Sequence, residues 1–259
     1  MTNFCTTITR YYGTNDKDLE RLDRFITQAK IYSKRILIGI NIDKDLTHSI
    51  DKYASQSHGN TSIEFIPIQP WIGISTPLNI LLNHVSSDEK FVLIQSIEIQ
   101  CTLDHIDYLR TFINDGNVLC VGVALDGHQK FDESKQDRYI LPLEGNTSPW
   151  NTFALWNLSK LRRTGFPLCS DFVQPPGMED SAVIGLQQKL FNGMKHNRAL
   201  LVHFHSNVCW LTNFNHNQDR MYQHELKMQS KNVRTKQLAD ILAFSNDNQI
   251  GIEYVKADL

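Results

Sequence analysis

The sequence predicts an α/β fold with a mainly parallel central sheet, and two observations lead to that expectation. Apolar segments of strand length alternate with amphipathic segments of helical length four times in the first half of the chain. The segment RILIGINI at 35–42 is a continuous apolar run between Arg35 and Asn41, as expected of a strand buried on both faces of a parallel sheet. Right-handed crossovers between such strands bring their carboxyl ends to one edge, where sheets of this kind bind ligands.

The alternating elements of the first half are placed by their periodicity and their end signals. Thr14, Asn15 and Asp16 are cap-forming residues that open a helix in which apolar residues recur at helical spacing. Pro77 stands in the first turn of another helix, where its missing N–H costs least. The expected strands are 5–9, 35–42, 62–68, 91–97 and 118–125, and the expected helices are 14–34, 46–54, 75–85 and 103–114.

The second half departs from this alternation. A polar stretch at 126–139 predicts a hairpin or a loop, and 148–166 reads as an amphipathic helix that ends at Gly165. A helix start at 177–190, a strand at 199–206 and a long polar helix over 218–244 follow. Because there is no repeat, low-complexity tract or linker, we expect a single domain over 1–259.

Composition limits the classes of function. The 259 residues are 41% hydrophobic and 21% charged with a net charge of −2, so no overall attraction to nucleic acid is expected. Five scattered cysteines without a CxxC pair favour a reducing compartment. We find no signal sequence and no apolar run long enough to span a bilayer, and we therefore expect a cytoplasmic protein without a transmembrane segment.

Two acidic motifs are candidates for chemistry. Glu98 follows the apolar strand at 91–97, with Ser96 two residues before it, at the edge where an α/β sheet binds ligands. Mg²⁺ or Mn²⁺ held by substrate phosphates needs only one or two carboxylates, although a single acid here is also typical of a strand reaching solvent. Glu179 and Asp180 begin a helix, where acids commonly cap free N–H groups, and where an ionised Asp180 can also accept a proton from an attacking hydroxyl.

Basic, histidine and aromatic residues supply weaker candidates. His203 and His205 alternate on a strand and can share a metal, although a single histidine with ordinary partners is the more frequent finding. One helical stripe of basic residues is typical of a solvated face or of a clamp on a diphosphate. Three aromatic residues can stack on a sugar or pack in the core. The stripe consists of Arg220, Lys227, Lys231 and Arg234, and the aromatic residues are Trp150, Phe153 and Trp156.

The order of these features resembles the GT-A nucleotide-sugar transferases, in particular the inverting, family-2-like glycosyltransferases. The match covers roughly residues 4–205, through short motifs. Its features are strand ends at Thr9-Arg10-Tyr11 and Asn41-Ile42-Asp43, a helix carrying Asn79, a strand followed by Ser96-Ile97-Glu98, and Gly177-Met178-Glu179-Asp180 at a helix start.

The resemblance implies a role for each of these residues. Ser96-Ile97-Glu98 stands where the family has an acidic DxD motif, so Glu98 would bind Mn²⁺ or Mg²⁺, joined by His205 or His203. Asp180 would be the catalytic base, with Glu179 beside it for capping and orientation. The residues expected to bind the nucleotide-sugar donor are Thr9, Arg10, Tyr11, Asp43, Asn79, Ser96, Glu98 and Trp150.

The function expected from the resemblance is transfer of a sugar, with inversion, from a nucleotide-diphosphate sugar to a hydroxyl of a glycan or another acceptor. The single domain would then hold a nucleotide-binding half (about 1–125), an acceptor and catalytic half (about 126–215) and a C-terminal helical extension (about 216–259). The alternative is a non-catalytic protein that binds sugar nucleotides or glycans on the same fold. A sugar-1-phosphate nucleotidyltransferase is disfavoured, because the segment TRYYGT at 9–14 is not the Gly- and Arg-rich loop of those enzymes.

Overall fold

The computed structural model describes residues 4–11, 16–42, 61–205, 208–211, 218–245 and 247–257. The expected helix at 46–54, the capping residues Thr14 and Asn15, and Asp43 lie outside the described residues, as does the side chain of Arg220.

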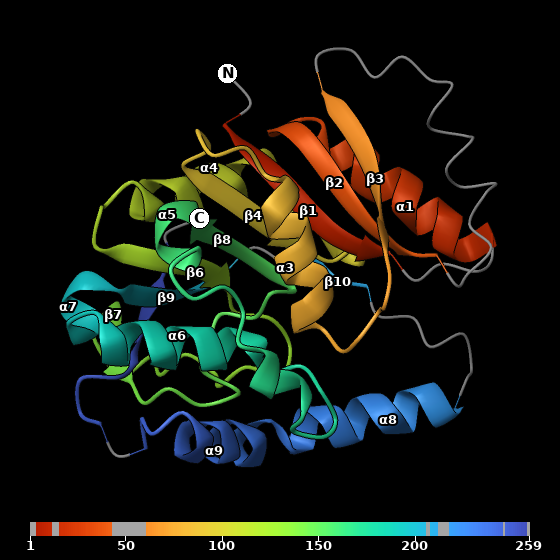
Figure 1. The fold of residues 1–259 in the computed structure, drawn as a ribbon. Helices are drawn as coiled ribbons and strands as arrows, with labels where there is room; N and C mark the ends of the chain where they lie inside the picture. Colours follow the sequence, from red (N-terminus) through yellow and green to blue (C-terminus); the bar gives the residue numbers. More distant parts are fainter. Residues whose placement is uncertain are drawn as a thin grey trace.

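Within the described residues, nine strands form one sheet in the order β3-β2-β1-β4-β8-β6-β9-β11-β7 (Figure 1). Most neighbours in this sheet run parallel, which confirms the expected class, whereas β8 and the edge strand β7 are antiparallel to their neighbours. The strands are β1 (Cys5–Tyr11), β2 (Ser33–Asn41), β3 (Ser62–Ile68), β4 (Phe91–Gln95), β6 (Val118–Val123), β7 (Arg138–Leu141), β8 (Phe153–Asn157), β9 (Arg198–His203) and β11 (Ile252–Lys256). A separate two-stranded ribbon pairs β5 (Ile99–Gln100) with β10 (Cys209–Trp210).

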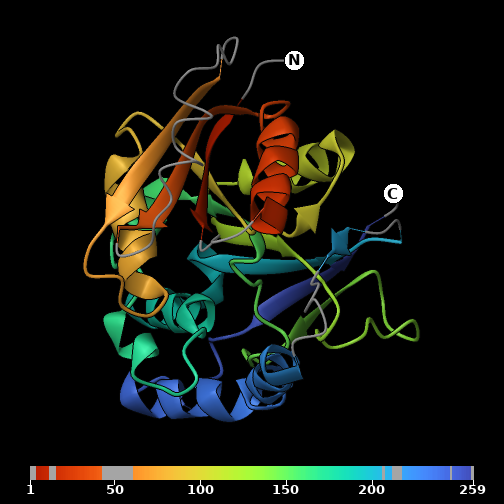
Figure 2. The same cartoon turned by 90° about the vertical axis from the view of Figure 1, so that its right-hand side faces the viewer.

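Helices cover both faces of the sheet, as Figure 2 shows for α1 and α3. One apolar cluster joins the sheet to α1 and α4, and a second joins its other face to α3, α5 and α6. Of two further helices, α9 packs on the outer side of α6, and α8 leads into α9 (Figure 1). The helices are α1 (Asp16–Ala29), α3 (Ser75–His84), α4 (Leu103–Ile113), α5 (Leu158–Leu161), α6 (Glu179–Leu190), α7 (Gly193–His196), α8 (Gln218–Gln229) and α9 (Lys231–Ile241), with a 3-10 turn, η1, at Leu168–Asp171.

The expected helix over 148–166 is wrong. Phe153–Asn157 forms strand β8, which lies antiparallel between β4 and β6, and only Leu158–Leu161 forms a short helix. The run from Phe153 to Trp156 is fully buried, so it fills a central strand position covered on both faces, where apolar residues need not alternate with polar ones. Gly165 does adopt the left-handed conformation (φ 61°) that follows the α5 turn.

The C-terminal region also differs from the expected long helix. The chain forms two helices that meet at Ser230 rather than one over 218–244. It then returns to the main sheet as β11, a strand that the sequence analysis does not predict and that pairs parallel to β9. In the described part of the chain, no helix is long and apolar enough to cross a membrane.

Candidate active site

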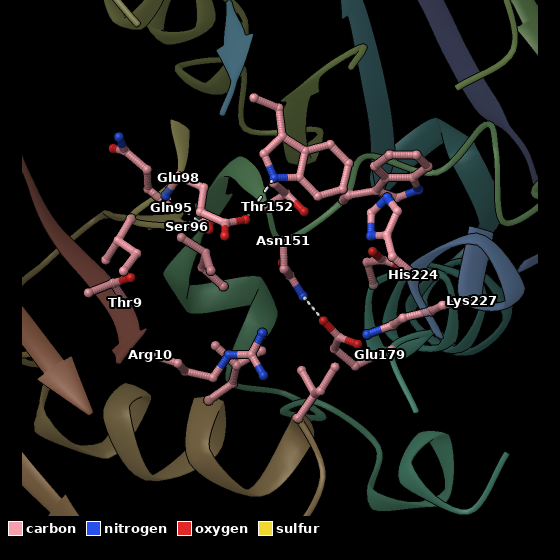
Figure 3. Close-up of a pocket in the computed structure, with 18 of the residues that line it drawn as sticks. Thr9, Arg10, Gln95, Ser96, Glu98, Asn151, Thr152, Glu179, His224 and Lys227 are labelled. Atoms are coloured by element: carbon pink, nitrogen blue, oxygen red, sulfur yellow. Dashed lines mark hydrogen bonds between the residues drawn. The ribbon is translucent and has the colours of Figure 1, made fainter. Parts of the chain in front are cut away.

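A cavity of about 660 Å³ opens at the edge of the sheet where β1 and β4 end (Figure 3). It brings together most of the charged and polar residues that the sequence analysis selects. The selected residues that line it are Thr9, Arg10, Ser96, Glu98, Trp150, Glu179, Asp180, Lys227 and Lys231.

The topology explains why residues so distant in sequence meet here. The carboxyl ends of parallel β1 and β4 supply Thr9 and Ser96 at one edge. Since β8 runs antiparallel to β4, its amino end lies at the same edge and supplies residues 150–152. The backbone N–H of Ser96 donates to the carbonyl of Thr152 at 2.8 Å, which fixes the loop after β4 against the segment before β8. The first turn of α6 and the junction of α8 with α9 complete the wall.

Glu179 and Asp180 are almost fully buried in the first turn of α6, with 4% and 3% of their surfaces exposed. The Asn151 side-chain amide donates to Glu179 Oε1 at 3.1 Å, and Asn151 Oδ1 in turn accepts from the Trp156 indole at 2.9 Å. Within the described residues, the other carboxylate oxygen of Glu179 is buried and has no hydrogen-bond partner. A buried acceptor with no partner at a cavity wall is suited to accept a hydrogen bond from a hydroxyl of a ligand.

The environment of Asp180 changes its acidity. Burial, followed by the neighbouring Glu179 charge, raises the pKa of Asp180 to about 7. The Lys231 ammonium and backbone N–H groups, including that of Ser181 at 2.6 Å from Oδ1, oppose this rise. A carboxylate with a pKa near neutrality, facing a cavity, has the property required of a general base.

Trp150 is held in a defined position by three neighbours. Its indole N–H donates to the Gly145 carbonyl at 2.7 Å, the His128 ring stacks on it at 3.5 Å, and Lys231 Nζ lies 3.6 Å from its ring centroid. Burial, with the nearby Lys231 charge, lowers the pKa of His128 to about 3, so this histidine is neutral. Trp150 is itself 2% exposed, so its ring serves mainly packing although it lines the cavity.

Glu98 lies at the expected metal position but has protein partners there. Trp210 Nε1 donates to Glu98 Oε2 at 3.2 Å, and Arg21 Nη1 lies 3.6 Å from Oε1. Arg21 therefore already places a fixed positive charge against the single carboxylate that a divalent cation would use. Nor do any three His, Cys, Asp or Glu side chains gather around an ion position in the part of the chain that is described. Because the Arg21 guanidinium and the Trp210 indole already hold the two oxygens of Glu98, this carboxylate does not fit a divalent metal site.

Several expected site residues lie elsewhere. Tyr11 is buried in the core, and Asn79 uses its side-chain amide to hold the Phe166 backbone, at 2.9 Å to the carbonyl and 2.8 Å from the N–H. Neither lines the cavity, and nor does His205, which packs edge-on against His203 with ring centroids 5.9 Å apart. The expected His205–Glu98 pairing is therefore not formed.

The basic stripe divides into residues with different surroundings. Lys227 and Lys231 line the cavity, whereas Arg234 is 1% exposed and does not. The Arg234 guanidinium donates to the carbonyls of Pro175 and Lys227, each at 2.5 Å. Arg234 thus ties the α8–α9 junction to the segment before α6, which is a structural role rather than ligand binding.

The cavity wall also contains functional candidates that the sequence analysis missed. Asn151 was hidden inside the wrongly expected helix, and Arg21 was one of many charged residues on an amphipathic helix. Trp210 and His224, whose rings meet edge-on at 5.5 Å, gave no sequence signal. Gly177 was named in the motif at the start of α6 but was given no role. Its φ is 123°, and an added Cβ would lie 2.6 Å from Lys227 Cε.

Solved structures share this architecture, although no protein-family model and no curated protein matches the sequence. The mannosyltransferase PcManGT of Pyrobaculum calidifontis, in complex with GDP-Man and Mn²⁺, is 17% identical, with 94% of this chain and 70% of that chain covered and a TM-score of 0.56. GalNAc-T7 with UDP, GalNAc and Mn²⁺ is 9% identical, with 73% and 40% covered and a TM-score of 0.53. The 4-diphosphocytidyl-2C-methyl-D-erythritol synthase of Anaerococcus prevotii is 11% identical, with 87% and 99% covered and a TM-score of 0.50. At these identities the likeness concerns the fold.

Proposed function

We propose that this chain, which has the GT-A fold of nucleotide-sugar transferases, is an inverting glycosyltransferase with Asp180 as its general base. The observation that carries the proposal is the position of Asp180: a buried carboxylate with its pKa raised to about 7, at the cavity formed by the carboxyl ends of β1 and β4. The glycosyltransferases PcManGT and GalNAc-T7, which share the fold, support it through the nucleotide and sugar ligands in their complexes.

The reaction follows from the charge and position of Asp180. Its carboxylate accepts the proton of an acceptor hydroxyl, whose oxygen then attacks the anomeric carbon of the donor sugar. The bond from that carbon to the diphosphate oxygen breaks on the opposite side, and the bonding electrons leave with the nucleoside diphosphate. The new glycosidic bond therefore has inverted configuration, and the proton remains on Asp180 until solvent removes it.

Residues around Asp180 would hold the donor and the acceptor. Thr9 Oγ1 is buried at the cavity and has no hydrogen-bond partner among the described residues. A polar atom of the nucleotide-sugar donor can therefore form a hydrogen bond with it. Glu179, oriented by Asn151, presents its second oxygen as an acceptor for a sugar hydroxyl. We assign Glu179 to orienting the bound sugar rather than to proton transfer, because one of its carboxylate oxygens already accepts the hydrogen bond from Asn151.

The two rival functions differ from this one in measurable ways. A non-catalytic binding protein has no need of a buried base, whereas Asp180 is kept buried beside a second acid at a cost in solvation. Nucleotidyl transfer occurs on this fold, as the Anaerococcus prevotii synthase illustrates. That reaction would consume a nucleoside triphosphate and release pyrophosphate, and no sugar would be transferred.

The proposal is tested by a screen of nucleotide sugars. Thermal unfolding of the protein should shift upward with its donor, since a ligand at about 100 times its Kd stabilises the folded state by roughly 2.7 kcal/mol. The donor so identified is then incubated with the protein and a panel of glycans and other hydroxyl acceptors, and products are detected by mass spectrometry and NMR. Stabilisation by a donor with neither transfer nor donor hydrolysis would support the binding protein instead.

The pH dependence of transfer provides a second prediction. Asp180 acts as a base only when deprotonated, and its raised pKa means that it is protonated below about pH 7. We expect kcat/KM to fall about tenfold per pH unit as the pH drops below 7, whereas an ordinary aspartate would keep it constant down to about pH 4. A profile flat from pH 5 to 7, measured where the protein remains folded, would contradict the assignment.

A further inference from the structure

The fixed charges of the cavity wall balance, but they are not evenly paired. Arg21 lies 3.5 Å from Asp18 and 3.6 Å from Glu98, so it accompanies both of these acids. Lys231 faces Asp180, the group whose attraction most favours its charged form. The wall holds four acidic and four basic side chains: Asp18, Glu98, Glu179 and Asp180, with Arg10, Arg21, Lys227 and Lys231.

Arg10 and Lys227 are the two remaining cations of the wall, and the acid that most favours the charged form of Lys227 is Glu179, followed by Asp180. Figure 3 shows the Glu179 carboxylate between the Arg10 guanidinium and the Lys227 ammonium. The two cations are close enough that Arg10 disfavours the charged form of Lys227, while Glu179 favours it. Asp180 acts most on Lys231, so the two cations around the Glu179 carboxylate leave positive charge at this part of the cavity, and an anionic ligand would relieve their repulsion.

The position of Lys227 is built into the fold. The Lys227 carbonyl is held by the buried Arg234, which also holds the Pro175 carbonyl before α6. The Lys227 side chain passes over Gly177, where an added Cβ would lie 2.8 Å from Nζ, and the φ of 123° at Gly177 also favours glycine there. Burial is the main reason why the pKa of Lys227 is lowered, which means that its charge is poorly solvated.

We propose that Arg10 and Lys227 hold the donor's diphosphate and neutralise the charge that develops on it, in place of a divalent cation. This proposal rests on the proposed function, since it concerns the donor of the same site. The expectation of Mn²⁺ or Mg²⁺ places a metal at Glu98, where the Arg21 guanidinium and the Trp210 indole already occupy the carboxylate. A guanidinium and an ammonium donate charge-assisted hydrogen bonds to phosphate oxygens, and they stabilise a departing diphosphate without an ion.

The test measures binding of nucleoside diphosphates by calorimetry, with ADP, CDP, GDP, UDP and TDP and the matching nucleosides as probes. Each titration is run in EDTA and in Mn²⁺. We expect one diphosphate to bind with the same Kd, within about twofold, under both conditions. Lys227→Met and Arg10→Gln should each weaken it roughly 10- to 100-fold, the range for hydrogen bonds to charged groups. The nucleoside, which lacks the diphosphate, should lose less than threefold.

Matched variants separate charge from folding. Lys236→Met, at an exposed lysine of α9, and Arg163→Gln, at an exposed arginine, should leave diphosphate binding unchanged. Thermal unfolding confirms that each variant is folded, and Met retains the apolar stem of Lys227. Glu98→Gln should not reduce binding in Mn²⁺, because no metal is held there.

The outcomes distinguish failure of this inference from failure of the proposed function. Diphosphate binding that requires Mn²⁺ and is lost in Glu98→Gln would overturn the proposed role of Arg10 and Lys227. It would leave a glycosyltransferase with a metal site. Unchanged binding by folded Lys227→Met and Arg10→Gln would overturn it as well. Absence of binding by every diphosphate in the parent protein would overturn both proposals.

Discussion

Sugar transfer by the Asp180→Asn variant is expected to be about 10²- to 10⁴-fold slower than transfer by the parent protein, the usual contribution of a general base. Asparagine has the shape of aspartate and can still accept the 2.6 Å hydrogen bond from the Ser181 N–H. It cannot take a proton from an acceptor hydroxyl. The loss should therefore appear in kcat, measured with saturating donor, while the Kd for the donor changes little.

Two comparisons define this result. Asp219 also stands in the first turn of a helix, α8, but it is exposed, so Asp219→Asn should transfer at the parental rate. Glu179→Gln should be affected less than Asp180→Asn, because it keeps one oxygen for Asn151 and loses only charge. Turnover by Asp180→Asn within about threefold of the parent would remove Asp180 from the mechanism. A greater loss in Glu179→Gln would move the base to Glu179.

The sequence predicted the sheet better than it predicted which residues line the cavity. Apolar runs such as 35–42 and 118–125 have few alternatives to a buried strand, so the strands of the first half were placed correctly. The helix expected over 148–166 was wrong because a short apolar run such as Phe153 to Trp156 has the same sequence pattern in a buried strand and in a helix. Only pairing with β4 and β6, which are distant in sequence, decides between them.

The residues that the sequence analysis brought to the cavity are those that stand near the end of a strand or helix. Thr9, Ser96 and Asp180 reach the cavity because chain topology alone brings such ends to one edge. The basic stripe shows what periodicity cannot supply: Lys227 and Arg234 lie seven residues apart on one side, yet one faces the cavity and the other is buried among carbonyls. How deeply each side chain is buried depends on the segment before α6 that packs against it, and the spacing of the basic residues carries no information about that segment.

Trp156→Ala is expected to lower the free energy of unfolding by about 3–5 kcal/mol, the usual cost of removing a large buried aromatic side chain. Trp156 is fully buried in β8 and packs edge-on against Phe166, with ring centroids 5.6 Å apart. Its indole N–H also holds Asn151, which in turn holds Glu179. Urea unfolding monitored by circular dichroism measures the loss, with Phe172→Ala, at an 81% exposed ring, as the matched control near zero.

Trp156→Phe separates the packing of this residue from its effect on the cavity. Phenylalanine retains most of the buried ring but donates no hydrogen bond, so Asn151 Oδ1 loses its partner at a cost of about 1–3 kcal/mol. Because Asn151 orients Glu179, this variant should also weaken donor binding or transfer although residue 156 does not line the cavity. A loss below about 1 kcal/mol in Trp156→Ala would contradict the central position of β8. That position is what brings Asn151 and Trp150 to the same edge as Thr9 and Ser96.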